Sequence, residues 1–290
     1  MMKGVAFAPG HVTGFFEPYI DSQNLERNGS VGAGINVSLG AVSEVFVQAS
    51  DRQMVEVFVN NKESKAPVTR YALKYLLGDR PLNVLVKTSL CLPMGQGFGM
   101  SAAGTLSATY AIAKILCLPT ENAIRASHCA ELSLRTGLGD VVASVFGGVE
   151  IRKKPGLPPW GVIEHIPSEY DVVFCIVGRR VNTQKVLTDP LKLSIICEYG
   201  NICIKKLLEK PSLENFFRLS QFFTMKTGLA NKCIIETIET ANKHGMSSMC
   251  MLGNSVFAVG NTDKLCTTLS EFGKVYVCHV DQCGARILEE

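Results

Sequence analysis

The stretch LPMGQGFGMSAAG, from Leu92 to Gly104, constrains the fold of this chain more than any other. It holds four glycines and lies between an alternating apolar run at 82–88 and a long run whose apolar residues repeat at helical spacing. Glycines let a backbone approach an anion closely, and a helix N-terminus carries free N–H groups and a partial positive charge. The stretch therefore predicts a phosphate-binding loop between a strand and a helix, with a turn needed only for packing as the alternative.

Three kinds of phosphate loop can be compared with this stretch. A Walker-type loop places a lysine after its last glycine, and no lysine follows these glycines. A dinucleotide loop, GxGxxA, matches Gly97, Gly99 and Ala102, but it requires a second strand that ends in an acidic residue about 20 positions on. Glu121 has that spacing, yet it lies at the start of a second predicted helix, which Thr120 would cap. The order strand, loop, helix, helix therefore disfavours a dinucleotide fold.

The third pattern is PxxxGxGxSAA, which is present here as Pro93, Gly97, Gly99, Ser101, Ala102 and Ala103. It resembles the ATP-binding motif of the GHMP kinases (galactose, homoserine, mevalonate and phosphomevalonate kinases), except that Met100 stands where most members have a second serine. The resemblance implies that this loop binds the phosphates of ATP. The residues assigned to that role are Pro93, Gly95, Gly97, Gly99, Met100, Ser101 and Ala102.

Three further stretches resemble the same family, in the same order along the chain. APGHVTGFFE, residues 8–17, is similar to the N-terminal substrate motif, with His11 in place of the lysine of many members. HCAELSLRTGLGDVVASVFGG, residues 128–148, is similar to the region that supplies a metal-binding glutamate and a catalytic aspartate, here Glu131 and Asp140. MCMLGNSVFAVG, residues 249–260, is a glycine-poor form of the third motif. Within the family, the chain looks like the archaeal pantoate kinases.

The resemblance implies an ATP-dependent kinase that transfers the γ-phosphate to the primary hydroxyl of pantoate, giving 4-phosphopantoate for coenzyme A synthesis. Ser101 and Glu131 would hold Mg²⁺, a hard cation that prefers oxygen ligands. Asp140 would orient the substrate hydroxyl, either as a positioner alone or also as the base that accepts its proton. The residues alone also allow simpler interpretations, in which Glu131 is a solvated helix carboxylate and Asp140 a helix N-cap.

Pantoate carries a carboxylate, which arginine recognises best because its guanidinium can bind both oxygens. The candidate arginines are Arg27, Arg152 and Arg179. Backbone N–H groups at 32–34 are a further candidate for the carboxylate, and His11 and Thr13 are candidates for the hydroxyls. The residues assigned to the substrate are His11, Thr13, Arg27 and Gly32.

The rest of the chain predicts an α+β protein of two domains. A short strand at Val5–Ala8 is expected to end at Pro9-Gly10, and separate strands are expected at 35–39 and 41–49. The resemblance implies a ribosomal-protein-S5-like domain over 1–155 and a GHMP-type α/β sandwich over 156–290, with the active site in the cleft between them. The proline-rich stretch KKPGLPPWG, residues 153–161, is the expected boundary.

Charge and cysteine usage narrow the partners and the compartment. The net charge is +3 with no block of like charge, which disfavours nucleic-acid binding. No secretory leader and no apolar run of about 18 residues is visible, so we expect no membrane span. Eleven cysteines without a CxxC pair are typical of a reduced, cytoplasmic protein. The sequence does not decide whether the protein forms a homodimer. Three other functions also remain possible from the sequence: a GHMP kinase for homoserine or a mevalonate derivative, a non-catalytic ligand-binding member of the family, and a dinucleotide oxidoreductase.

Overall fold

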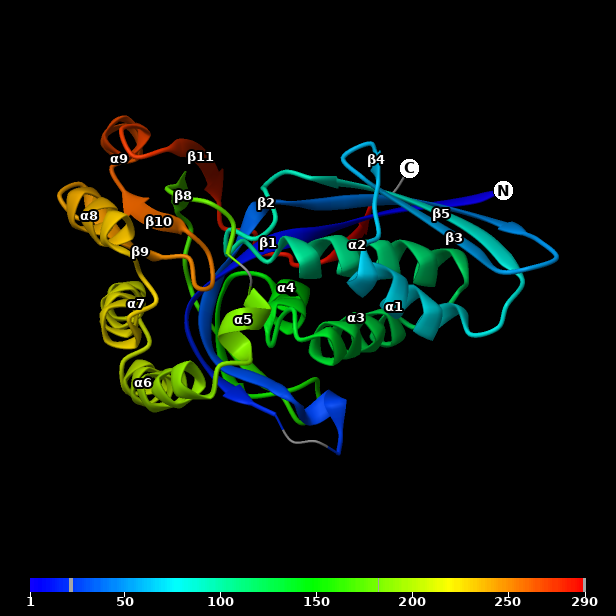
Figure 1. Cartoon of the computed structure of the whole chain (residues 1–290), viewed down its shortest axis with the longest axis horizontal. Coiled ribbons are helices and arrows are strands. Elements are labelled where there is room, and N and C mark those ends of the chain that lie inside the picture. Colours follow the sequence, from blue (N-terminus) through cyan, green and yellow to red (C-terminus); the bar gives the residue numbers. More distant parts are fainter. Residues whose placement is uncertain (21–22, 182, 289–290) are drawn as a thin grey trace.

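The computed structural model of the chain describes residues 1–20, 23–181 and 183–288 and has the expected α+β class (Figure 1). The larger sheet is built from β1 (Met2–Tyr19), β2 (Gly29–Ala49), β3 (Met54–Val59), β4 (Lys62–Glu63), β5 (Leu82–Leu90), β6 (Val149–Lys154), β7 (Val162–Ile166) and β12 (Arg286–Leu288). Its main path runs β12-β1-β2-β5-β3-β4, and β6 pairs with β2 and β7. All the pairings are antiparallel except that of β3 with β5.

A long hairpin of β1 and β2 forms the centre of this sheet. The two strands have 18 and 21 residues and stay paired from Met2 opposite Val47 to Tyr19 opposite Gly29. The prediction that the first strand ends at Pro9-Gly10 is wrong, because a bulge between Ala8 and Gly10 takes up the irregularity and the pairing resumes. The strands expected at 35–39 and 41–49 are likewise one continuous strand.

Helices cover one face of the larger sheet (Figure 1). They are α1 (Pro67–Leu77), α2 (Met100–Ile115), α3 (Thr120–Leu134) and α4 (Asp140–Phe146), and a short 3₁₀ helix, η1 (Leu25–Arg27), packs against α3. The succession of α2 and α3 without a strand between them is confirmed. Thr120 does not cap α3, because the short link from α2 starts the helix one residue earlier, with Pro119 at the N-cap.

The second half carries the smaller, antiparallel sheet, in the order β11-β8-β10-β9. Its strands are β8 (Asp171–Ile176), β9 (Gly245–Met249), β10 (Ser255–Gly260) and β11 (Lys274–His279). Its helices are α5 (Thr183–Leu187), α6 (Pro190–Glu209), α7 (Leu213–Thr227), α8 (Lys232–Ala241) and α9 (Thr262–Ser270). The longer helices stack side by side at the end of the molecule away from the N-terminus (Figure 1).

The domain boundary at 155/156 stays a prediction. Strands from the two sides of this boundary pair with each other. β7 follows the proline-rich loop yet pairs with β6, and β12 returns to pair with β1. The apolar core is continuous across the division, and the rings of Phe98 and Phe174 lie 4.9 Å apart between centroids. The two halves therefore share both a sheet and a core.

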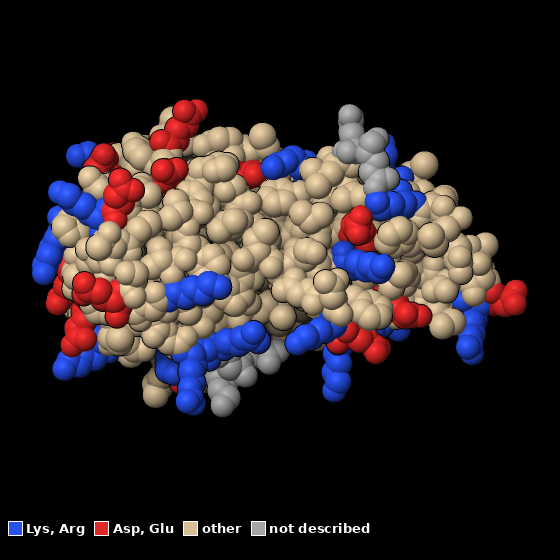
Figure 2. Space-filling model, turned by 90° about the horizontal axis from the view of Figure 1, so that it is seen from above, with Lys and Arg blue, Asp and Glu red and all other residues tan. Residues whose placement is uncertain are grey.

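The surface carries charges of both signs. On the face shown in Figure 2, basic and acidic side chains lie mostly around the margins, and residues of other types fill much of the middle. In the ranges given above, none of the helices is long and apolar enough to cross a membrane.

Candidate active site

The glycine loop packs between β1 and the turn that follows β9. Gly97 has φ +80°, and a Cβ there would lie 2.8 Å from the Cys250 carbonyl oxygen. Gly99 has φ +62°, and a Cβ there would lie 3.1–3.2 Å from the backbone of His11. The His11 N–H donates to the Phe98 carbonyl over 3.0 Å. Glycine is therefore required at both positions, by conformation and by space.

The loop ends at the N-terminus of α2, where Gly99 is the N-cap without a side-chain cap. The first N–H groups of a helix have no partner within it, so they are available to an anion. Gly95, Gly97, Gly99, Met100, Ser101 and Ala102 line the pocket at this point. Pro93, also assigned to the phosphates, is half-buried and is not one of the lining residues.

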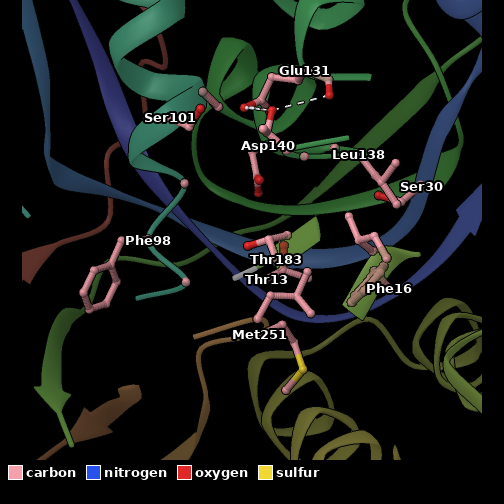
Figure 3. A pocket seen from close by; sticks show the side chains of 18 of the residues that line it. Thr13, Phe16, Ser30, Phe98, Ser101, Glu131, Leu138, Asp140, Thr183 and Met251 are labelled. Carbon is pink, nitrogen blue, oxygen red and sulfur yellow. Dashed lines mark hydrogen bonds between the residues drawn. The ribbon is translucent and has the colours of Figure 1, made fainter. Parts of the chain in front are cut away.

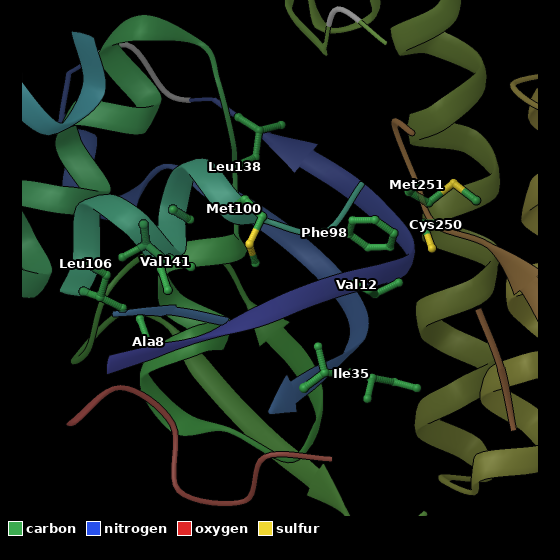
Figure 4. Close-up of a cluster of buried hydrophobic side chains, with 14 of the residues drawn as sticks. Ala8, Val12, Ile35, Phe98, Met100, Leu106, Leu138, Val141, Cys250 and Met251 are labelled. Atoms are coloured by element: carbon green, nitrogen blue, oxygen red, sulfur yellow. The ribbon is translucent and has the colours of Figure 1, made fainter. Parts of the chain in front are cut away.

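The Met100 side chain belongs to the apolar core. It is buried, close enough to Gly10 that a Cβ there would lie 3.0 Å from the methionine methyl group (Figure 4). The departure from the usual second serine therefore replaces a polar side chain in the loop by a core contact.

The third motif closes the loop from the other side. A Cβ on Gly253 would lie 2.1 Å from the backbone of Gln96, so the turn lies directly on the glycine loop. The Gln96 amide donates to the Gly178 carbonyl over 2.8 Å and accepts from the Asn254 N–H over 3.3 Å. Met251, which donates to the Thr13 carbonyl over 3.1 Å, also lines the pocket. Gln96 and this turn thus hold the loop against the second half of the chain.

Asp140 is the residue whose carboxylate faces the pocket opposite the loop (Figure 3). The N-cap interpretation is wrong: Asp140 is the first residue of α4, the N-cap is Gly139, and no side chain caps this helix. Instead the His11 Nδ1 donates to Asp140 Oδ1 over 2.7 Å. Burial alone raises the pKa of Asp140, but the hydrogen bond from His11 and the charges of His11 and Arg152 outweigh it and lower that pKa.

Glu131 lies beside Asp140, and the solvated interpretation is wrong because its side chain is only 3% exposed. The side chains of Ser101 and Glu131 point toward each other, and the Asp140 carboxylate lies beside them and points into the pocket (Figure 3). Burial and the nearby Asp140 carboxylate raise the pKa of Glu131 to about 8, although hydrogen bonds from Ser101 and Thr136 partly oppose this. Its Oε2 is buried without a hydrogen-bond partner among the described residues. This corner of the pocket is therefore short of positive charge.

Asp140 is the outermost member of a row of charged side chains, which we call the buried charge row. The row continues inward through His11, Glu150 and Arg152. The His11 Nε2 donates to Glu150 Oε1 over 2.7 Å, and the Arg152 guanidinium donates to the same oxygen. The side chains of His11 and Glu150 have no exposed area, whereas that of Asp140 is 27% exposed. Burial disfavours a charged imidazole, but its two carboxylate partners outweigh this and raise the pKa of His11. Charges therefore alternate along the row, and only Asp140 reaches the pocket.

The other residues assigned to the substrate divide into two groups. Thr13 lines the pocket, opposite Ser101 (Figure 3). His11 is fully buried behind Asp140, and Gly32 pairs with Phe16 and Arg152 inside the sheet, so neither is a lining residue. Arg27 is exposed and stacks on Trp160, with 5.1 Å from its guanidinium carbon to the ring centroid.

Sequence reasoning did not find Glu150, although a signal was present. A single carboxylate in the apolar run GGVEI predicts a buried charge, which needs a partner elsewhere in the chain. Ser30, Thr183 and Leu187 also line the pocket without a motif to mark them. They come from strand and helix ends that only the fold brings together.

The fold and the pocket are those expected of a small-molecule kinase, with a glycine loop at a helix N-terminus that faces a carboxylate. The family model described as "GHMP kinases N terminal domain" matches residues 66–148. A pantoate kinase of Methanocaldococcus jannaschii is 32% identical over 278 residues, which cover 94% of this chain and 99% of the relative. A pantoate kinase of Thermococcus kodakarensis is 33% identical over 261 residues, covering 88% and 86%. The chain belongs to the GHMP kinase family.

A solved structure agrees with this assignment over the whole chain. It is described as a phosphotransferase related to the CoA biosynthesis pathway, is 29% identical and superposes with a TM-score of 0.91, covering 99% of both chains. The expected GHMP kinase fold is therefore confirmed.

Proposed function

We propose that this protein is a pantoate kinase, which transfers the γ-phosphate of ATP to the primary hydroxyl of pantoate and forms 4-phosphopantoate and ADP. The structural observation that carries the proposal is the Asp140 carboxylate, which faces the pocket opposite the N-terminus of α2. The names of the two relatives described above support pantoate as the acceptor.

ATP would place its phosphates against the glycine loop. The backbone N–H groups at the start of α2, helped by the helix dipole, suit phosphate oxygens. The loop is held from both sides, by His11 of β1 and by the turn at Gly253, so it is preorganised for this role. Binding by a rigid backbone also explains why the side chain at position 100 is free to join the core.

Ser101 and Glu131 would hold Mg²⁺ together with phosphate oxygens. Within the described ranges no three His, Cys, Asp or Glu side chains form a metal site by themselves, so the ligand oxygens must complete the coordination. The unpartnered Oε2 of Glu131 and the raised pKa of this carboxyl fit a cation, which would stabilise the ionised form. When bound, Mg²⁺ neutralises negative charge on the transferred phosphate.

Asp140 would accept a hydrogen bond from the primary hydroxyl of the substrate. The hydroxyl oxygen forms a bond to the γ-phosphorus, the bond from that phosphorus to the β–γ bridging oxygen breaks, and the hydroxyl proton passes to Asp140. Its lowered pKa keeps the carboxylate ionised and able to orient the hydroxyl at neutral pH. Since the transition state of phosphoryl transfer is loose, orientation contributes more than strong basicity.

Neither Arg152 nor Arg27 lines the pocket, but Arg152 lies nearer to it, where its positive charge favours a substrate carboxylate without direct contact. Arg152 is buried, and its Nε has no hydrogen-bond partner among the described residues. It lies directly behind Gly139, a lining residue, where a Cβ would be 2.8 Å from that Nε. Arg27 is outside the pocket. The apolar lining residues Phe16 and Leu138 suit the methyl groups of pantoate.

A coupled assay of ADP release tests the proposal. Pantoate, homoserine and mevalonate are compared at equal concentration, with Mg²⁺ and ATP present. We expect kcat/KM to be highest for pantoate by at least tenfold, about 1.4 kcal/mol in transition-state binding. Absence of turnover with pantoate, or a preference for another alcohol, would refute it.

A further inference from the structure

The buried charge row contains a side chain to which neither the family motifs nor the reaction assigns a role. Glu150 lies on β6, has no exposed area, and accepts hydrogen bonds from His11 and Arg152 at one oxygen. It is not a lining residue of the pocket, so it cannot touch the substrate. Its connection with the reaction runs through His11, which bonds Asp140 with its other ring nitrogen.

The chain makes room for this contact. Gly34 of β2 pairs with Thr13 on one side and with Glu150 on the other. A Cβ on Gly34 would lie 2.4 Å from His11 Nε2 and 2.9 Å from Glu150 Oε1. Any larger residue would push the imidazole and the carboxylate apart. Glycine is therefore required at position 34 because only a residue without a side chain leaves room for the hydrogen bond between His11 and Glu150.

The hydrogen bonds define the state of the imidazole. Each ring nitrogen faces a carboxylate oxygen over 2.7 Å, so each carries a proton and donates it. With both nitrogens engaged, the ring can neither rotate nor flip without losing a buried hydrogen bond. A fixed imidazolium in turn holds the Asp140 carboxylate in one orientation.

We propose that Glu150 is a positioning residue of the phosphoryl transfer, which acts through His11 to hold the Asp140 carboxylate against the substrate hydroxyl. Loss of the Glu150 charge leaves His11 with one anionic partner, and the geometry of Asp140 loosens. The rate of the chemical step then falls, while the binding of both substrates stays the same.

Glu150→Gln is the informative variant. The amide oxygen can still accept from His11 and Arg152, and the amide nitrogen takes the place of Oε2, which has no partner in the described protein. The matched control is Glu164→Gln on the adjacent strand β7, where Glu164 is half-exposed and pairs with Lys153. His11→Gln and the double variant His11→Gln/Glu150→Gln complete the set, and thermal melts establish that each is folded.

Steady-state kinetics measure kcat and both KM values for each variant. We expect Glu150→Gln to lower kcat by about ten- to a hundredfold, as is typical of groups that orient a reacting side chain, with each KM within about twofold of the wild type. Glu164→Gln should match the wild type. The double variant should be no slower than His11→Gln, because Glu150 acts only through His11. An unchanged kcat in Glu150→Gln, a raised KM alone, or additive losses would overturn the proposal.

The ¹⁵N spectrum of the imidazole rings in the wild type gives a readout independent of turnover. We expect His11, assigned by comparison with His11→Gln, to carry protons on both ring nitrogens at pH 7.5; a neutral ring would overturn the proposal, even where Glu150→Gln fails to fold. The kinetic part rests on the proposed function for its substrate. If the wild type turns over another alcohol and not pantoate, the proposed function fails, and the same variants are compared with that alcohol.

Discussion

Glu131→Gln tests whether the metal corner of the pocket is short of positive charge. Glutamine has the shape of a protonated glutamate and stays neutral at every pH. In the folded protein without metal, burial and Asp140 raise the pKa of Glu131 to about 8, against a usual value of 4.5. The folded protein therefore keeps a proton that the unfolded chain releases between these two values.

The sign and size of the effect follow from these two pKa values. The stabilisation from protonated Glu131 is fully present below pH 4.5 and is lost as pH rises through about 8. At about 1.4 kcal/mol per pKa unit, the wild type should lose about 3–4 kcal/mol of unfolding free energy from this group between pH 5 and pH 8. The variant has no such carboxyl group and loses no unfolding free energy from this position. Between pH 5 and pH 8, its unfolding free energy relative to that of the wild type should therefore rise by the same amount.

Urea unfolding, followed by the fluorescence of Trp160, the only tryptophan of the chain, measures the difference. The titrations are run at pH 5, 6, 7 and 8 with a chelator present. Addition of Mg²⁺ and a non-hydrolysable ATP analogue should then stabilise the wild type more than the variant at pH 8. If the two unfolding free energies run parallel from pH 5 to pH 8, Glu131 is already ionised in the metal-free protein and the reasoning is wrong.

Three other substitutions probe the glycine loop and the Asp140 carboxylate. Asp140→Asn should lower kcat by about 10²–10⁴-fold and leave the calorimetric affinity for an ATP analogue unchanged; retention of full activity would remove Asp140 from the mechanism. Gly97→Ala adds a Cβ 2.8 Å from the Cys250 oxygen at φ +80°, so it should cost about 1–3 kcal/mol in a urea titration and raise the KM for ATP. Its control is Gly104→Ala in α2, where the nearest atoms are 3.5 Å away, which should be neutral or stabilise by about 0.5–1 kcal/mol. Met100→Ser should cost about 2–5 kcal/mol of stability without raising kcat, whereas a more active and equally stable protein would show that this side chain is not a core contact.

The sequence predicted the elements that local periodicity determines. The consecutive helices expected after the glycine loop are α2 and α3. The glycine pattern also located the loop. A left-handed backbone conformation and close backbone contacts both require glycine, and the sequence has glycine at positions 97 and 99. Features of this kind depend on neighbours in the chain.

Long-range pairing decided what the sequence did not predict. Pro9-Gly10 has the local character of a strand end, but β2 continues past it and holds β1 in the sheet. As a result His11 is a strand residue that faces the core, whereas a histidine in a loop would be free to meet a substrate. Its partners Asp140 and Glu150 lie 129 and 139 positions away, which no local pattern records.

The pairing of β12 with β1 has a consequence for synthesis of the protein. Residues 286–288 cover the outer edge of β1 at Val5–Phe7. Before these residues are made, this edge of β1 presents unpaired N–H and C=O groups, an arrangement that favours association between nascent chains. Removal of residues 286–288 would therefore expose this edge of β1 at Val5–Phe7.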